Sequence, residues 1–465
     1  MIYIALGASD EIGGSCHYLN IHGTGLLLDS GIDPEEEGLA GIPRLDIIDE
    51  NSDYWVDHAI ITHAHHDHIG AMPVVLQKFP HAIAHMSGAT EQLAEILLPA
   101  SARLQLRKQR EGTSTSNPLF YEEELDAYSY LYRSHDLNIP FDVTGVRASV
   151  PVRASFYDAG HILGSVGILL EFESGGEEKR YFYTGDTGMR AQTIIPGAEY
   201  PDSPIDVLFL ESTLGADPES EKTSRRTEEN GLAEAVAEVL KRGGTVLLPV
   251  FALGRGQEII ALVDRYKKRG LIPEETPVYT AGLMRAISDV YDKTRFSTPR
   301  LNPDFEVYGV SQSRLPRSHT ATLLALTEPS IHIVGSGMMF ERTISNRLAQ
   351  QLVESDKNGI FMVGYTRPDS PGHRLLEARR AGKGTKAVLD ENKGPQSIQC
   401  DVDRFRFSGH SHRRDLMEVV KRLNPGRIVL VHGETEARAW MKNNIEYFYP
   451  EIDVISPQTG EVVEL

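Results

Sequence analysis

Four histidines and an aspartate lie within six consecutive positions, in the stretch HAHHDH that begins at His63. Imidazole nitrogens and carboxylate oxygens are the usual ligands of a catalytic zinc ion, which keeps one position open for water. His63 and His65 are two residues apart and can face one way on a loop, while Asp67 and His68 turn toward a neighbouring position. The stretch therefore predicts ligands for two adjacent metal ions, with His66 left unassigned.

One segment cannot complete two metal sites, so further ligands must come from elsewhere in the chain. His161 lies in AGHILG, where the glycines let the loop approach closely. Asp186 lies in TGDTG and has two oxygens with which to bridge two cations. Asp29 ends the run LLLD and is a candidate acceptor that holds a ligand histidine by its other ring nitrogen. Taken singly, these residues are more often core histidines or turn formers, and only the whole set indicates a metal centre.

Five short apolar runs each lead into a polar residue that can do chemistry. They are Leu26–Leu28 before Asp29, Ala59–Ile61 before His63, Tyr181–Tyr183 before Asp186, Val207–Leu210 before Glu211, and Ile428–Val431 before His432. Such runs, bounded by Gly, Asp or Thr, are typical of buried strands. A helix is predicted over Thr227–Leu240 with Thr227 as its cap, which makes the pattern α/β. Ligands gather at strand carboxyl ends in such folds, so one shared site is predicted.

Composition excludes several classes of protein. The 465 residues are enough for two or three domains, and no run of about 18 apolar residues predicts a membrane span. The first residues, MIYIALGASD, do not resemble a signal peptide. Cys16 and Cys400 are the only cysteines, which excludes a disulfide framework and favours a cytoplasmic location. The net charge of −19 argues against generic nucleic-acid binding, although a basic cleft or a metal ion supplies local positive charge.

In this order and spacing, Asp29, HAHHDH, His161 and Asp186 resemble the motifs of the metallo-β-lactamase fold. The second half is similar to the β-CASP nucleases, the branch that contains the polyadenylation endonuclease subunit and ribonuclease J. The stretches that carry this resemblance are GASDEIGGSCHYL, LESTLG, PVFALGRGQEI, GSGMMFER, FSGH and LVHGE. The resemblance implies an αβ/βα sandwich of two mixed sheets, formed by residues 1–211 and 396–465, with an inserted α/β cap over residues 212–395.

The resemblance also implies roles for individual residues around two zinc ions per chain. The implied metal ligands are His63, His65 and His161 for one ion, Asp67, His68 and His432 for the other, and Asp186 between them. His410 is the implied general acid, oriented by Glu211, and Asp67 and Asp29 complete the implied catalytic set. Ser408, Gly409, His412 and Arg413 are the implied substrate contacts.

Two zinc ions about 3.5–4 Å apart can share a hydroxide and support an in-line displacement at phosphorus. The expected products of such a ribonuclease are a 3′-hydroxyl and a 5′-phosphate. Histidine at position 432 favours RNA, because the DNA-repair branch of the family tends to carry an apolar residue there. The stretch SGHSHRR is similar to that of ribonuclease J, but Gly364–Arg374 and Glu341–Thr343 depart from the family pattern. Endonuclease and 5′-to-3′ exonuclease modes therefore both stay open.

Three other functions compete with a ribonuclease. The same dinuclear core serves hydrolases of small molecules such as thioesters, against which the β-CASP motifs argue. A DNA nuclease is disfavoured by His432, and a non-catalytic interaction protein is disfavoured by the intact ligand set. The expected partner is single-stranded RNA, with a second copy of the chain or a helper RNA-binding protein as further candidates and no membrane.

Overall fold

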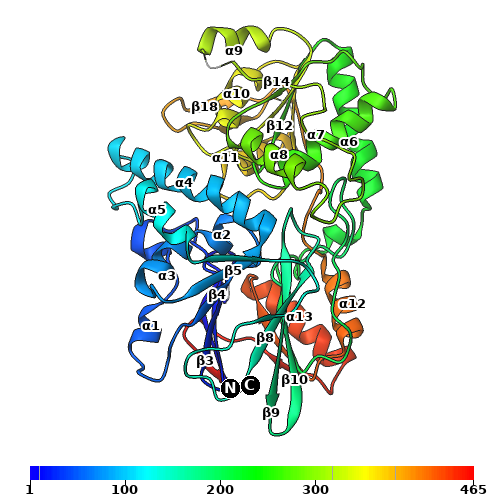
Figure 1. Ribbon diagram of the computed structural model, residues 1–465. Helices are drawn as coiled ribbons and strands as arrows, with labels where there is room; N and C mark the ends of the chain where they lie inside the picture. The colour runs from blue at the N-terminus through cyan, green and yellow to red at the C-terminus, as the bar shows by residue number, and fades with distance from the viewer. Residues whose placement is uncertain (10, 317, 383) are drawn as a thin grey trace. The chain divides into compact units, whose positions relative to one another are not determined.

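The computed structural model describes residues 1–9, 11–316, 318–382 and 384–465 (Figure 1). These residues form two compact units. The first comprises Met1–Ala191, Ile195–Pro218 and His410–Leu465, and the second comprises Gln192–Ile194 and Glu219–Gly409. Apart from Gln192–Ile194, the second unit runs from Glu219 to Gly409, whereas the cap is predicted over residues 212–395. The chain leaves the first unit, builds the second, and then returns to finish the first.

Two mixed sheets, each with seven strands within the described ranges, form the first unit. In spatial order the first sheet contains β22 (Val462–Glu464), β1 (Ile2–Gly7), β2 (Cys16–Ile21), β3 (Thr24–Leu28), β4 (His58–Ile60), β5 (Ile83–Ser87) and β6 (Tyr132–His135). The second contains β21 (Asp453–Ile455), β20 (Arg427–Val431), β11 (Val207–Glu211), β10 (Glu177–Tyr183), β9 (Val166–Ser174), β8 (Val152–Asp158) and β7 (Phe141–Asp142). Because β1 and β22 pair antiparallel, the two chain ends lie side by side (Figure 1).

Alternation of side chains explains why these sheets stack. In β3, Leu26 and Leu28 belong to a core shared with Phe156 and Phe209 of the second sheet, whereas Leu27 belongs to a core on the opposite face. Successive side chains of a strand point to opposite faces, so a fully apolar strand can be buried on both. The inter-sheet core and one helix-covered outer core on each sheet make an αβ/βα sandwich. This confirms the predicted fold class.

Helices cover the outer faces of the sandwich. On the first sheet these are α1 (Asp46–Asp49), α3 (Met72–Lys78), α4 (Gly88–Arg110) and α5 (Glu122–Ser129), with the short α2 (His66–Ile69) and the 3-10 turn η1 (Gly38–Gly41) in loops. On the second sheet they are α12 (Arg413–Leu423) and α13 (Thr435–Phe448). In α12, Leu416, Val419, Val420 and Leu423 are spaced to bury one face of the helix.

The second unit is built around a parallel sheet. Its strands are, in spatial order, β14 (Ser313–Arg314), β13 (Val278–Thr280), β15 (Ser330–Val334), β12 (Thr245–Pro249), β16 (Gly359–Met362) and β19 (Asp401–Arg404), with β17 (Lys386–Val388) and β18 (Pro395–Ser397) as a separate pair. The helices are α6 (Arg225–Lys241), α7 (Arg255–Lys268), α8 (Leu283–Lys293), α9 (His319–Ala325), α10 (Ile344–Leu352) and α11 (Pro371–Arg380), preceded by η2 (Glu219–Glu221).

The five predicted apolar runs coincide with strands β3, β4, β10, β11 and β20, except that Ile61 lies one residue beyond the end of β4. The predicted helix at Thr227 is present, but its cap is wrong. The helix begins at Arg225, and the hydroxyl of Ser224 accepts a hydrogen bond from the backbone N–H of Thr227. Ser224 and Thr227 both suit a cap, and the earlier residue takes the role because the helix extends one turn further back. No helix among the described residues combines the length and apolar character needed to cross a membrane.

Candidate metal centre

Most residues of the candidate site lie at or just after the carboxyl ends of parallel strands. Strands β3 and β4 are parallel neighbours, and β10, β11 and β20 form a second parallel set. Parallel neighbours end at the same edge of a sheet, so their following loops meet. Asp29 therefore lies beside the loop of His63, while Asp186, Glu211 and His432 lie together at the end of the second set.

The carboxylate of Asp29 holds the histidine-rich loop in place. It accepts hydrogen bonds from the backbone N–H and hydroxyl of Thr62 at 2.7 and 2.9 Å, and from Nδ1 of His68 at 2.8 Å. A Cβ at Gly31 would lie 1.7 Å from the carbonyl oxygen of Asp67, so glycine lets the neighbouring chain segment pack directly on this loop. With Nδ1 of His68 bonded to Asp29, its Nε2 is left to face the site, as in metal centres with an outer carboxylate.

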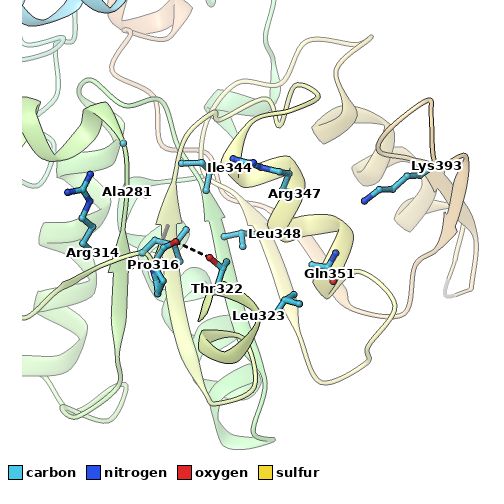
Figure 2. Close-up of a pocket in the computed structure, with 12 residues that line it drawn as sticks. Ala281, Arg314, Pro316, Thr322, Leu323, Ile344, Arg347, Leu348, Gln351 and Lys393 are labelled. Atoms are coloured by element: carbon cyan, nitrogen blue, oxygen red, sulfur yellow. Dashed lines mark hydrogen bonds between the residues drawn. The ribbon is translucent and has the colours of Figure 1, made fainter. Parts of the chain in front are cut away.

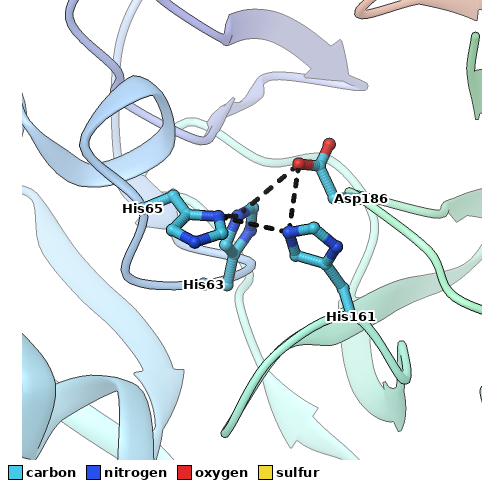
Figure 3. A group of neighbouring side chains, drawn as sticks. All are labelled: His63, His65, His161 and Asp186. Carbon is cyan, nitrogen blue, oxygen red and sulfur yellow. Dashed lines mark hydrogen bonds and ion pairs between the residues drawn. The ribbon is translucent and has the colours of Figure 1, made fainter. Parts of the chain in front are cut away.

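Three histidines and an aspartate converge in a first group, which Figure 3 shows. Nδ1 of His65 lies 3.0 Å from Nε2 of His63 and 3.1 Å from Nε2 of His161. Oδ2 of Asp186 lies 3.6 Å from the Nε2 atoms of both His63 and His161. Burial lowers the pKa of His63 and His65, which favours the neutral imidazoles that bind metals.

A second group consists of Asp67, His68 and His432. Oδ2 of Asp67 lies 4.0 Å from Nε2 of His68 and 3.7 Å from Nε2 of His432. Asp186 contacts this group as well, with Oδ2 at 3.4 Å from Nε2 of His68 and Oδ1 at 3.2 Å from Nδ1 of His432. The two oxygens of one carboxylate thus reach both groups, as a bridging ligand must.

These residues fit metal ions. Four ligands at about 2.0–2.1 Å in a tetrahedron lie about 3.3 Å from one another. Four of the six corresponding separations in the first group are 3.0 to 3.6 Å, and all of its ligand atoms lie within 4.8 Å of one another. In the second group, the buried Nε2 atoms of His68 and His432 have no hydrogen-bond partner within the described part of the chain. Buried polar atoms without partners are costly, and a bound cation would satisfy both.

His410 stands beside the two groups and is held by Glu211. Nδ1 of His410 lies 3.2 Å from both carboxylate oxygens of Glu211, and its Nε2 lies 3.8 Å from Oδ2 of Asp186. Burial disfavours the charged imidazolium, but the carboxylates of Glu211 and Asp186 outweigh it and raise the pKa of His410 to about 9. A raised pKa favours the protonated imidazolium at neutral pH, and Nε2 of this ring lies beside Asp186 of the metal-binding groups.

Two residues of the centre have a left-handed backbone. Asp29 has φ 63° and His432 has φ 48°, and each directly follows the last residue of its strand. This conformation is uncommon for residues with a side chain and is found most often at functional sites. It turns each side chain out of the strand direction toward the centre.

The predicted substrate contacts have other partners. His412 is the N-cap of α12, where its Nδ1 accepts from the backbone N–H of Asp415 and its Nε2 lies 3.2 Å from Oδ2 of the same residue. The guanidinium of Arg413 lies 4.4 Å from the ring centre of Trp440. Ser408 is exposed and Gly409 is buried. The geometry therefore gives His412 and Arg413 structural contacts, and a role in substrate binding stays a prediction for all four residues.

Sequence reasoning missed the polar side chains that support the centre. The hydroxyl of Tyr183 donates to Oδ2 of Asp29 at 2.8 Å, and the hydroxyl of Thr213 lies 3.1 Å from Nδ1 of His432. Tyr183 lies within an apolar run that predicts only a buried strand. A tyrosine in such a strand indicates a buried hydrogen bond, since a buried phenol needs a partner, and this feature could have identified the residue.

Comparisons with known proteins agree with this geometry. Residues 10–207 match the metallo-beta-lactamase superfamily, residues 256–375 match the Beta-Casp domain, and residues 395–457 match the Zn-dependent metallo-hydrolase RNA specificity domain. An RNase J-like protein of Methanocaldococcus jannaschii is 30% identical over 92% of this chain and 91% of its own length.

Eukaryotic proteins are similar over nearly the whole chain. Cleavage and polyadenylation specificity factor 73 of Drosophila melanogaster is 28% identical over 99% of this chain, and Endoribonuclease YSH1 of Kluyveromyces lactis is 26% identical over 95%. This chain spans only 64% and 56% of those two proteins. A solved structure of a protein of unknown function from Enterococcus faecalis shares the fold, with a TM-score of 0.57 at 14% identity over 100% of this chain and 99% of that one.

Proposed function

Because the chain belongs to the β-CASP family of metallo-β-lactamase-fold hydrolases, we propose that it is a ribonuclease that uses two zinc ions to hydrolyse single-stranded RNA. One observation carries this proposal. Asp186 contacts two groups of metal-binding side chains, and His410, held by Glu211, lies 3.8 Å from the same carboxylate. Such an arrangement suits hydrolysis of a phosphodiester, which needs both charge stabilisation and a proton for the leaving oxygen.

The proposed ligands divide between the two ions. His63, His65 and His161 would hold one, Asp67, His68 and His432 would hold the other, and Asp186 would lie between them. When bound, the ions would activate a water molecule and stabilise negative charge on the phosphate.

The chain's own residues would supply proton transfer and orientation. The imidazolium of His410 would donate its proton from Nε2 to the leaving 3′-oxygen, since Nδ1 is engaged by Glu211. Glu211 itself accepts the backbone N–H of Thr187 at 2.8 Å, which keeps its carboxylate in position. Asp29 would orient His68 through Nδ1. The products would be a 3′-hydroxyl and a 5′-phosphate.

RNA is the proposed substrate because the named relatives are an RNase J-like protein and endoribonucleases, and because histidine occupies position 432. Ser408, Gly409, His412 and Arg413 remain proposed substrate contacts. We also propose the cytoplasm as its location, since both cysteines are free thiols. A homodimer or a helper RNA-binding protein is proposed as the partner that supports RNA affinity in a chain of net charge −19.

A comparison of linear and circular RNA tests the function and its mode. Zinc-loaded protein is incubated with 5′-monophosphorylated linear RNA and with a circle of the same sequence. We expect cutting that a chelator stops and that zinc restores. Cleavage of the circle identifies an endonuclease, whereas mononucleotides from the linear form alone identify an exonuclease. The proposal fails if a zinc-loaded preparation leaves both RNAs intact, most clearly if it hydrolyses a thioester or cuts only DNA instead.

A further inference from the structure

A cavity of about 420 Å³ lies in the second unit, and none of its lining residues belongs to the metal centre (Figure 2). It opens at the carboxyl ends of two neighbouring parallel strands: Ala281 follows β13, and Leu315 follows β14. Helix α10 forms another wall. Ligands of open parallel sheets bind at this edge, and a cavity of this volume is within the usual range for small-molecule sites. Its position therefore points to a ligand site rather than a packing defect.

The floor of the cavity is apolar and its rim is cationic. Leu315, Ile344 and Leu348 contribute the apolar surface, and Leu315 and Leu348 are almost fully buried. Arg314, Arg347 and Lys393 also line the cavity, and Figure 2 shows Arg314 on one side of Ile344 and Leu348 and Lys393 on the other. No carboxylate occurs among the lining residues that the structure describes. A ligand with an anionic group and a flat apolar part would satisfy both surfaces.

Among the residues that the structure describes, some arginines of the unit have a carboxylate partner, whereas the two arginines of the rim do not. Arg295 pairs with Glu306 and Arg374 pairs with Glu391. Arg314 and Arg347 are exposed, and within residues 1–9, 11–316, 318–382 and 384–465 their guanidinium groups have no ion pair or hydrogen bond. In a chain with 66 acidic and 47 basic residues, two arginines without a carboxylate among the described residues around one cavity leave positive charge there that an external anion can neutralise. Guanidinium groups bind phosphate through paired hydrogen bonds.

We propose that this cavity holds one nucleotide unit, with its phosphate between Arg314 and Arg347 and its base or ribose against Leu315, Ile344 and Leu348. Lys393, which donates to the side-chain oxygen of Gln350, adds a third positive charge at the rim. The nucleotide is either one residue of a bound RNA, which rests on the proposed function, or a free mononucleotide. The cavity is too small for a helix or a duplex, which separates it from a general docking groove.

Charge reversal with a matched control tests this site. Arg314 and Arg347 are both changed to glutamate, and the control protein carries Arg226→Glu and Arg269→Glu, two exposed arginines of the same unit outside the cavity. Both proteins undergo the same change of net charge. Binding of a fluorescein-labelled oligouridylate is measured by anisotropy in chelator, so that no cleavage occurs, and thermal melting checks that each variant folds.

The cavity variant should bind the RNA about tenfold more weakly than the control, and the slope of log affinity against log salt should fall by about 0.7 for the one phosphate that Arg314 and Arg347 share. Uridine 5′-monophosphate, titrated by calorimetry, distinguishes the sources. If the unaltered chain binds the monophosphate and the cavity variant does not, the cavity is a free-nucleotide site. If the cavity variant binds the RNA more weakly and the unaltered chain does not bind the monophosphate, the cavity is a subsite for RNA. Equal affinities of the two variants for both probes would overturn the proposal. Cleavage by the unaltered chain is scored separately, so failure of either proposal is recognised independently.

Discussion

Removal of the Tyr183 hydroxyl should weaken metal binding although Tyr183 touches no metal-binding atom. Asp29 accepts from the backbone and side chain of Thr62, from His68 and from Tyr183, so Tyr183→Phe leaves the carboxylate with three of these four hydrogen bonds. A hydrogen bond to a charged group is worth about 1.5–3 kcal/mol, and loss of an outer partner of a metal ligand costs about 10–100-fold in affinity. Because Tyr183 acts on His68 only through Asp29, we expect zinc affinity to fall by about tenfold, the lower end of this range.

The assay is zinc affinity measured by competition with a chromophoric chelator, together with urea unfolding of the metal-free protein. Tyr181→Phe is the matched control. Tyr181 lies on the same strand and in the same inter-sheet core, is 2% exposed like Tyr183, and donates its hydroxyl to Sδ of Met1 instead of to Asp29. Phenylalanine keeps the buried ring in both variants, so both should fold. Equal zinc affinities for the two variants would refute the idea that the hydroxyl orients His68 through Asp29.

Three further changes have defined outcomes. His410→Ala should retain both metals and lose about 10²–10⁴-fold in RNA cleavage, because it removes the proton donor and no proposed ligand. Asp186→Ala should lose metal content as well as cleavage, since its carboxylate contacts both metal-binding groups. Burial lowers the pKa of His85 to about 3, below the 6.5 of an exposed histidine. As the pH falls below 6.5, the unfolded chain therefore takes up a proton at this residue that the folded chain does not, and the free energy of unfolding decreases. At about pH 5 the loss from this group is about 2 kcal/mol, and urea unfolding should show that His85→Gln reduces the acid-induced loss whereas exposed His81→Gln does not.

Local patterns in the sequence predicted the metal-binding groups because ligand types and spacing are explicit there. The HAHHDH stretch supplies residues to both groups, and the short strands before Asp186 and His432 are apolar enough to be recognised. The sequence did not predict contacts between side chains that are far apart along the chain. Arg314 and Arg347 are separated by helix α9 and strand β15, and neither belongs to a motif, so only the folded sheet reveals their shared cavity.

His412 shows how one residue type fits two uses. A histidine next to two arginines suggests a phosphate contact, which stays a prediction, and in the structure its ring caps α12 by accepting the backbone N–H of Asp415 in the first turn. Both uses draw on the same hydrogen-bonding atoms, and the sequence does not say which one the backbone will demand. The cap of α6 was misplaced for the same reason, since Ser224 and Thr227 are equally suitable by type.

Because the chain returns to the first unit after the second, the parts of the first unit are synthesised at widely separated times. Strand β11 pairs with β20, Val207 opposite Arg427, and β1 pairs with β22, Ile2 opposite Glu464. Pairings between such distant residues form slowly. Neither seven-stranded sheet has all its strands until the segment from His410 to Leu465 has left the ribosome. His410 and His432 arrive with that segment. A nascent chain that displays HAHHDH but ends before His410 therefore has neither the proposed proton donor nor the complete second group of metal-binding side chains.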